Sequence, residues 1–167
     1  MSPNVINRPV TPEDLAAITH LHARAFGPGR FTRTAYRVRE GTPDISRYCR
    51  AAMLGDRLIA AVRFTPITIG GANGSLLLGP LVVEPDFAGQ GFGRRLIAEA
   101  MAAAKDDGVR LVVLVGDEPY YGRFGFHPVP PGQITMPGPV DPRRLLAAEL
   151  VPGSLAGAHG LIAGAHF

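Results

Sequence analysis

The spacing of apolar and polar positions divides the first half of the chain into helices followed by strands. A helix begins at Thr11, because Thr is a good N-cap, Pro12 suits the first helical position and Asp14 follows three residues later. Apolar residues at helical spacing continue this helix to Phe26. Polar and apolar residues alternate over 57–69, which is typical of a half-buried strand. The pattern also predicts a short extended segment, a second helix and two further strands, at 5–8, 31–40, 47–54 and 76–83.

Two breaks in this pattern predict local geometry. The glycine-rich run 70–74 separates the second and third strands, and its Asn73-Gly74 pair is among the strongest short hairpin signals. Gly79-Pro80 interrupts the third strand. Because proline cannot donate to a strand ladder, we expect a bulge or a splayed edge at this point.

The third strand leads into the stretch around which the chain is organised. The strand breaks at Glu84-Pro85-Asp86, the chain passes glycines at 89, 91 and 93, and an alanine-rich helix follows from about Phe92 to Asp107. The N–H groups of such a loop and of the first helical turn point into one hollow, where the helix dipole adds positive potential. This arrangement is typical of an anion site, most often one for phosphate. The spacing G-x-G-x-G disfavours a dinucleotide fold, and the lack of a following Lys-Ser or Lys-Thr excludes a Walker loop.

The second half of the chain contains one clear strand and a long proline- and glycine-rich part. The β-branched run 111–115 predicts a buried strand that lies parallel to the third strand through the helical crossover. Residues 120–124 have room for one or two helical turns, and 127–142 is mostly loop with a short strand near Ile134. The period of 143–150 fits a helix or a strand equally. The tail beyond it is small and glycine-rich, with at most two extended pieces.

Length and composition favour one globular domain. The 167 residues are 46% hydrophobic and 19% charged, and they show no internal repeat and no second domain. We therefore predict a single domain over 1–167, with a core at 4–128 and a Pro/Gly-rich C-terminal part at 129–167.

Charge, cysteine and hydropathy argue against several partners. The net charge of +3 comes from scattered basic residues without interleaved aromatics, so we expect no nucleic-acid partner. Cys49 is the single cysteine, which excludes an intramolecular disulfide and a cysteine-rich metal site. His20 and His22 point to different faces of a helix, and we expect no metal. A free thiol, no signal-like start and no apolar run of ~20 residues predict a cytoplasmic protein without a membrane partner.

Two motifs follow the predicted third and fourth strands. The first is Ala88-Gly89-Gln90-Gly91-Phe92-Gly93-Arg94, and the second is Tyr121-Gly122-Arg123-Phe124-Gly125-Phe126. Together they resemble the pyrophosphate loop and the tyrosine, three residues, Gly-Phe signature of the GNAT family of acyl-CoA N-acyltransferases. Gly91 and Gly93 match the loop pattern, but Ala88 stands where the family has Gln or Arg. The turn and the tail with Val151-Pro152-Gly153 resemble the YhbS-like predicted acetyltransferases within that family.

The resemblance implies an α+β / α/β fold and a cofactor site. The expected fold is a mixed, mostly antiparallel central sheet with a parallel pair at the cofactor cleft and helices on both faces. Acetyl-CoA would lie between the strands ending at Val83 and Val115, and the backbone of Leu81, Val82 and Val83 would pair with its pantetheine amides. Arg94 and Arg95 are candidates for the nucleotide phosphates, although Arg95 fits a solvated helix face nearly as well. The pyrophosphate would bind the N–H groups of Gly89, Gln90, Gly91, Phe92, Gly93 and Arg94.

The resemblance also implies transfer of an acetyl group to a primary amine of a small molecule, peptide or protein, by direct attack in a ternary complex. Tyr121 is the candidate that protonates the leaving thiolate, with a packing role as the alternative, and Tyr120 is expected in the core. A backbone N–H near Val83 could serve the carbonyl oxygen. The general base stays open, and Cys49 is expected to be a buried small residue rather than a nucleophile. The candidates for the base, each more often structural, are Glu84, Glu118, His127, Glu149 and water.

Two other functions remain as hypotheses. One is a catalytically silent acyl-CoA-binding module, because position 88 lacks its side chain and no base is evident. The other is an unrelated nucleotide-binding domain, which the glycine spacing disfavours. The charge of the acceptor does not follow from the sequence, because the arginines at 30, 33, 37 and 39 stand near Glu40 and Asp44. Family members are often dimers, so a homodimer is an expectation by analogy.

Overall fold

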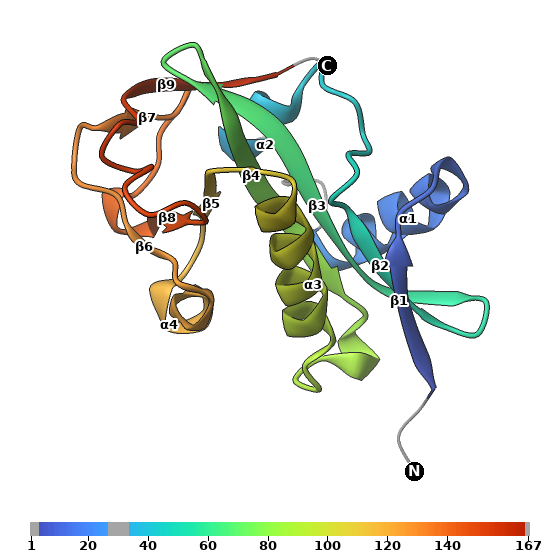
Figure 1. Ribbon diagram of the computed structural model, residues 1–167. Coiled ribbons are helices and arrows are strands. Elements are labelled where there is room, and N and C mark those ends of the chain that lie inside the picture. The colour runs from blue at the N-terminus through green and yellow to red at the C-terminus, as the bar shows by residue number, and fades with distance from the viewer. Residues whose placement is uncertain (1–3, 27–33, 166–167) are drawn as a thin grey trace.

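The computed structural model describes residues 4–26 and 34–165, and they form one twisted sheet with helices around it (Figure 1). The helices are α1 (Leu15–Phe26), α2 (Thr34–Arg39), α3 (Phe92–Asp106) and α4 (Glu118–Tyr121). The strands are β1 (Val5–Pro9), β2 (Arg50–Leu54), β3 (Arg57–Ile69), β4 (Ala72–Val83), β5 (Leu111–Val115), β6 (His127–Pro128), β7 (Ile134–Thr135), β8 (Leu145–Glu149) and β9 (Gly160–Gly164). Residues 31–33 of the predicted second helix lie outside the described residues.

The main sheet has the strand order β1-β2-β3-β4-β5-β8-β6. Neighbours along this path are antiparallel except β4 and β5, which are parallel and connected through α3. A further strand, β9, pairs antiparallel with β3 and parallel with β7. The prediction of a mostly antiparallel sheet with one parallel pair next to the glycine loop is confirmed.

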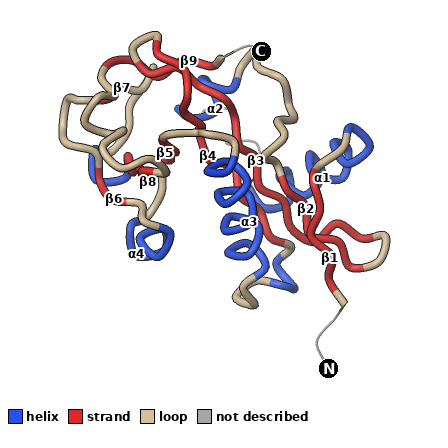
Figure 2. Tube along the Cα trace, in the orientation of Figure 1, coloured by secondary structure: helices blue, strands red, loops and turns tan. Residues whose placement is uncertain are grey.

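Helices cover both faces of the sheet, as predicted (Figures 1 and 2). The apolar side of α3 is fully buried at Leu96, Ile97 and Ala100, and it packs with Ile59 and Phe64 of β3. On the other face, Leu21 of α1 belongs to a second buried cluster with residues of β2, β3 and β4, among them Ala51, Ala61 and Val82. None of the helices within residues 4–26 and 34–165 is long and apolar enough to span a membrane.

The predicted start of the first helix is confirmed. A 3₁₀ turn at Pro12–Asp14 precedes α1, and the backbone N–H of Thr11 donates to Oδ2 of Asp14 over 2.8 Å. The same carboxylate accepts two hydrogen bonds from Arg8 of β1, at 2.7 and 2.8 Å. These bonds hold the pKa of Asp14 down to about 2 and fasten the helix start to the edge strand.

The hairpin turn predicted within the run 70–74 is present, but it lies at the start of the run and not at the Asn73-Gly74 pair. Ile69 pairs with Ala72, so the two-residue turn is Gly70-Gly71, and Asn73 lies within β4. Both turn glycines have positive φ, 58° and 85°, which a right-twisted two-residue hairpin requires. β9 also passes close to Gly70, because a Cβ there would lie 2.0 Å from the carbonyl oxygen of His159.

The bulge expected at Gly79-Pro80 is present. The register between β3 and β4 shifts there, so that both residues oppose the single residue Arg63, and the Gly79-Pro80 peptide bond is cis. Parallel pairing with β5 ends just before this point, at Leu77 opposite Val113. Beyond it, β4 and β5 diverge.

The C-terminal part contains more sheet than the sequence indicates. Residues 143–150, which fit a helix or a strand, contain β8, inserted between β5 and β6. Four consecutive residues of β8, 145–148, are buried because both faces of this strand are covered. The sequence of β8 therefore lacks the alternation of apolar and polar residues that is typical of a strand with one exposed face. The short strand near Ile134 is confirmed as β7.

Candidate active site

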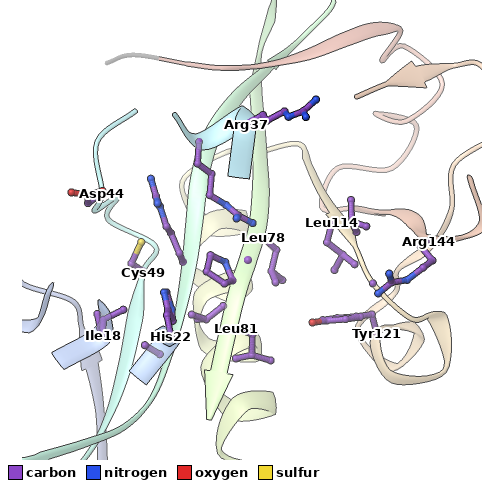
Figure 3. A pocket seen from close by; sticks show the side chains of 18 of the residues that line it. Ile18, His22, Arg37, Asp44, Cys49, Leu78, Leu81, Leu114, Tyr121 and Arg144 are labelled. Atoms are coloured by element: carbon purple, nitrogen blue, oxygen red, sulfur yellow. The ribbon is translucent and has the colours of Figure 1, made fainter. Parts of the chain in front are cut away.

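The divergence of β4 and β5 opens a cavity of about 1020 Å³ (Figure 3). Its walls come from Leu78–Leu81 of β4, from Leu114–Asp117 after β5, and from α1, α2 and the loop that precedes β2. A neighbouring pocket of about 270 Å³ continues past Val83 and is lined by Gly89, Gly91 and Gly93 of the loop. The predicted cofactor-binding residues of β4 and of the glycine loop therefore border two adjoining hollows along one side of β4, with the exception of buried Val82 and of Gln90.

Among the three β4 residues predicted to contact the cofactor, Val82 is the one that lines neither hollow. Its side chain belongs to the cluster beneath α1, and its backbone pairs with Ala61 of β3. Alternate residues of a strand face opposite sides, so Leu81 and Val83 face the α3 side and Val82 faces the α1 side. Gln90 is exposed, and its side chain donates to the carbonyl oxygen of Asp86 over 3.5 Å.

The three loop glycines serve different purposes. Gly89 and Gly91 have φ values of 77° and 85°, a region that side chains rarely adopt, and Gly91 is the N-cap of α3. Gly93 lies inside the helix, where a Cβ would approach Leu81 to 3.3 Å. For Gly93 the contact in the structure is with β4, which lets α3 pack directly on the strand.

The start of α3 supplies backbone donors. Its first intrahelical hydrogen bond runs from Arg95 N–H to the carbonyl oxygen of Gly91 over 3.1 Å. The N–H groups of residues 92–94 precede this bond and have no acceptor within the helix. They lie beside the smaller pocket, where the helix dipole adds positive potential.

Tyr121 lies across the cavity from β4. Its hydroxyl points into the cavity from the α4 side, opposite Leu78 and Leu81 (Figure 3). Its ring packs edge-to-face on Tyr120 at 4.8 Å and on Phe126 at 6.1 Å between centroids. Within the described part of the chain, the hydroxyl has no hydrogen-bond partner, in contrast to the packing-only alternative, in which a carbonyl holds it.

Burial is the main cause that raises the pKa of Tyr121 to about 12, with further contributions from Tyr120 and Asp117. The phenol is therefore fully protonated at any physiological pH. The pKa of this phenol is roughly 3.5 units higher than the ~8.5 reference pKa of a thiol. Tyr121 is thus built to donate a hydrogen bond, and complete proton transfer requires a thiolate whose own pKa is raised by the same buried surroundings.

Tyr120 is only partly a core residue. Its ring packs against the core beneath α3 but also lines the smaller pocket, next to Arg123. The adjacent tyrosines therefore face the two hollows separately, Tyr121 the larger and Tyr120 the smaller.

The residues considered as general base do not line the larger cavity. Glu84 is buried and held in ion pairs with Arg24 of α1 and, at 3.7 Å, with Arg57 of β3. His127 and Glu118 form an exposed pair at 3.0 Å, and Glu149 accepts the N–H of Leu155. These contacts favour the structural role considered for each of them.

Other ionisable residues line the cavity, and sequence reasoning did not select them as bases. They are His22 of α1, Asp44, Asp117 and Asp141. Asp117 pairs with Arg144 at 3.3 Å. The arginines Arg37 and Arg39 also line the cavity, whereas Glu40 does not, and Arg30 and Arg33 lie outside the described residues. The segments that carry these residues are far apart in the sequence and meet only around the opening between β4 and β5. No local sequence spacing could therefore have predicted that these residues share one cavity.

Cys49 lies in the cavity wall, one residue before β2, so the predicted strand starts three residues later than expected. The thiol is buried, its Sγ accepts the N–H of Phe64 over 3.5 Å, and it lies 3.7 Å from the carbonyl oxygen of the same residue. These contacts fit the small buried residue that the sequence predicts. Within residues 4–26 and 34–165, no three His, Cys, Asp or Glu side chains gather into a group that could hold a metal ion.

The model of the acetyltransferase (GNAT) family matches residues 15–126, which include both motifs, all residues that line the smaller hollow and most of those that line the larger one. The chain belongs to the GNAT family. Among curated proteins it is 28% identical over 107 residues to the uncharacterized N-acetyltransferase YhbS of Escherichia coli (strain K12), covering 64% of each chain. It is 31% identical over 121 residues to the uncharacterized N-acetyltransferase YjhQ of the same strain, covering 69% of this chain and 65% of that one. The matches thus span less than two thirds of these relatives.

Solved structures agree with this assignment. A crystal structure of YhbS from Escherichia coli in complex with CoA has a TM-score of 0.83 at 24% identity, covering 99% of this chain and 92% of that one. At this identity the match establishes the fold. A GNAT family acetyltransferase from Brucella melitensis in complex with acetyl-CoA has a TM-score of 0.61 at 28% identity, covering 87% and 96%. The predicted family and fold are both confirmed.

Proposed function

We propose that this protein is an acyl-CoA N-acyltransferase that transfers an acetyl group from acetyl-CoA to a primary amine of a small molecule, peptide or protein. The observation that carries the proposal is the opening between β4 and β5, with the Tyr121 hydroxyl on one side and the glycine loop at its end. Membership of the GNAT family and the CoA and acetyl-CoA complexes of the structural neighbours support the choice of cofactor.

The cofactor would lie along β4. Its pyrophosphate would sit in the smaller pocket on the N–H groups at the start of α3, and its pantetheine arm would run past Val83 and Leu81. The ladder to β5 ends at Leu77, and no strand within residues 4–26 and 34–165 pairs with this part of β4 on that side. Its backbone is therefore available for the pantetheine amides. The thioester would then reach the larger cavity near the bulge at Gly79.

The reaction would be a direct displacement in a ternary complex. The neutral amine attacks the thioester carbon, a C–N bond forms, and the carbonyl oxygen takes up charge that a backbone N–H of β4 near Val83 stabilises. The C–S bond then breaks, and the Tyr121 hydroxyl donates to the leaving thiolate. The proton lost by the amine passes to a base or to water, and the ionisable residues that line the cavity are the closest candidates.

The proposal includes a cytoplasmic enzyme that needs no metal, acts without nucleic acid or membrane, and forms a homodimer by analogy with its family. The test of its chemistry is release of free thiol from acetyl-CoA in the presence of a panel of primary amines. We expect amine-dependent thiol release from the wild type and a rate lower by about 10²-fold in Tyr121→Phe, the usual contribution of a positioned proton donor. Tight acetyl-CoA binding without turnover on any amine would contradict the proposal and favour a silent acyl-CoA-binding module.

A further inference from the structure

The phosphate loop of this chain lacks a side chain that its family uses. Position 88 is alanine, at the end of the 3₁₀ turn Pro85–Phe87, where its N–H donates to the carbonyl oxygen of Pro85 over 3.2 Å. A methyl group offers neither charge nor a hydrogen bond to a phosphate. The loop itself therefore contributes backbone donors and the dipole of α3, but no charge from position 88.

A guanidinium from a different segment stands beside this loop. Arg123, in the 3₁₀ turn Gly122–Phe124 that follows α4, lines the same pocket of about 270 Å³ as the three loop glycines. Its Cζ lies 5.2 Å from the ring centroid of Tyr120, within cation–π range. The Tyr120 ring is in turn fixed edge-to-face by Tyr121 and Phe124. Arg123 is exposed, but its guanidinium lies against a packed aromatic surface.

The charges in this pocket are of one sign. Arg94 and Arg123 line it, and no acidic residue of the described part of the chain does. Neither arginine takes part in any of the ion pairs found within residues 4–26 and 34–165. Two guanidinium groups and a helix N-terminus converge on one hollow, and this arrangement fits a doubly charged anion such as a pyrophosphate.

We propose that Arg123 supplies the positive charge to the cofactor pyrophosphate that position 88 lacks. In this chain the positive charge comes from the turn after α4 instead of the loop before α3, and the pocket keeps its affinity for phosphate. This inference rests on the proposed function, since it requires that CoA bind at the glycine loop.

The test is calorimetric titration with CoA and with dephospho-CoA, which keeps the pyrophosphate but lacks the 3′-phosphate. Arg123→Gln should weaken the binding of both ligands by about tenfold, the effect of one charge-assisted hydrogen bond. Lys105→Gln is the matched control, because it removes the same charge from the exposed far end of α3, about 16 Å along the helix from Arg94. We expect it to bind both ligands as the wild type does.

Two further variants test whether the charge has been relocated. Ala88→Arg, introduced into Arg123→Gln, should recover most of the lost affinity because it places a guanidinium at the position where the family pattern has Gln or Arg. Arg123→Lys should retain affinity within about threefold, because it keeps the charge but loses the planar fork. Circular dichroism of each variant establishes that it is folded.

The outcomes separate this inference from the proposed function. A wild type that binds neither ligand would contradict the proposed function itself. A wild type that binds, with Arg123→Gln binding equally well, would overturn the role of Arg123 and leave the proposed function intact. A loss seen with CoA but not with dephospho-CoA would place Arg123 on the 3′-phosphate, and a failure of Ala88→Arg to recover affinity would show that the two positions do not serve the same phosphates. Either result would overturn the inference.

Discussion

Gly116 is predicted to set the position of the Tyr121 hydroxyl. It follows β5, is buried, and donates its N–H to the carbonyl oxygen of Arg144 over 2.9 Å. A Cβ at this position would lie 2.6 Å from Cε2 of Tyr121 and 3.0 Å from a methyl group of Leu114. Gly116→Ala therefore adds one methyl group directly against the edge of the tyrosine ring.

The size of the effect follows from that distance. An ordinary contact begins at 3.4 Å, so the ring edge must move away by about 0.8 Å to accommodate the methyl group. A misplacement of about 1 Å at a reacting group can lower the rate by 10²-fold. We expect Gly116→Ala to reduce kcat by about 10- to 100-fold, to leave the affinity for acetyl-CoA near that of the wild type, and to cost about 1–3 kcal/mol of folding free energy.

The assay is steady-state thiol release, combined with a double-mutant cycle. Gly122→Ala is the control, because its backbone is helical and its Cβ would meet only Cγ of Glu118, at 3.8 Å. If Gly116 acts through the hydroxyl, Gly116→Ala should add little to the loss already caused by Tyr121→Phe. Full additivity of the two losses, or an unchanged kcat in Gly116→Ala, would refute the reasoning.

Two further predictions concern pH. The rate should rise with pH as the amine loses its proton. Because burial raises the pKa of Tyr121 to about 12, the pH–rate profile should show no falling limb from Tyr121 below about pH 11. A falling limb near pH 9 that disappears in Tyr121→Phe would contradict this prediction. The hydrogen bonds from Arg8 lower the pKa of Asp14 from 3.8 to about 2, so this carboxylate stabilises the fold above its unfolded pKa and loses that effect as the pH falls through 2. Asp14→Asn should reduce the free energy of unfolding at pH 7 by about 2 kcal/mol, measured in urea, and its deficit should shrink between about pH 4 and pH 2, whereas exposed Asp86→Asn should show neither effect. A deficit that is independent of pH would refute the ion-pair explanation.

The sequence predicted the elements whose signals are local. The capped start at Thr11, the existence of strand β3, the crossover through α3 and the break at Gly79-Pro80 all depend on residues a few positions apart. Two turn signals stand next to each other within the run 70–74, and the approach of β9 to Gly70 favours the first of them. Strand β8 was ambiguous because its burial depends on partners far away in the chain.

The residues of the candidate site were likewise predicted where their signals are local and missed where they depend on the fold. The glycine loop and Tyr121 were found from contiguous motifs, and both border the hollows. Arg123 lay within a recognised motif, but its place beside the loop depends on how the turn after α4 lies relative to the start of α3. The contact that makes Gly93 necessary, with Leu81, is likewise visible only in the fold.

The most direct test of the central claim is a calorimetric titration of acetyl-CoA into the wild type, Gly91→Glu and Gly108→Glu. Gly91 and Gly108 lie at opposite ends of α3 with φ values of 85° and 87°, so the two substitutions impose the same strain and the same charge. We predict saturable binding by the wild type and by Gly108→Glu, and none by Gly91→Glu, whose carboxylate would stand where the pyrophosphate binds. Absence of binding to the folded wild type, or equal binding by all three proteins, would contradict the placement of the cofactor on the glycine loop.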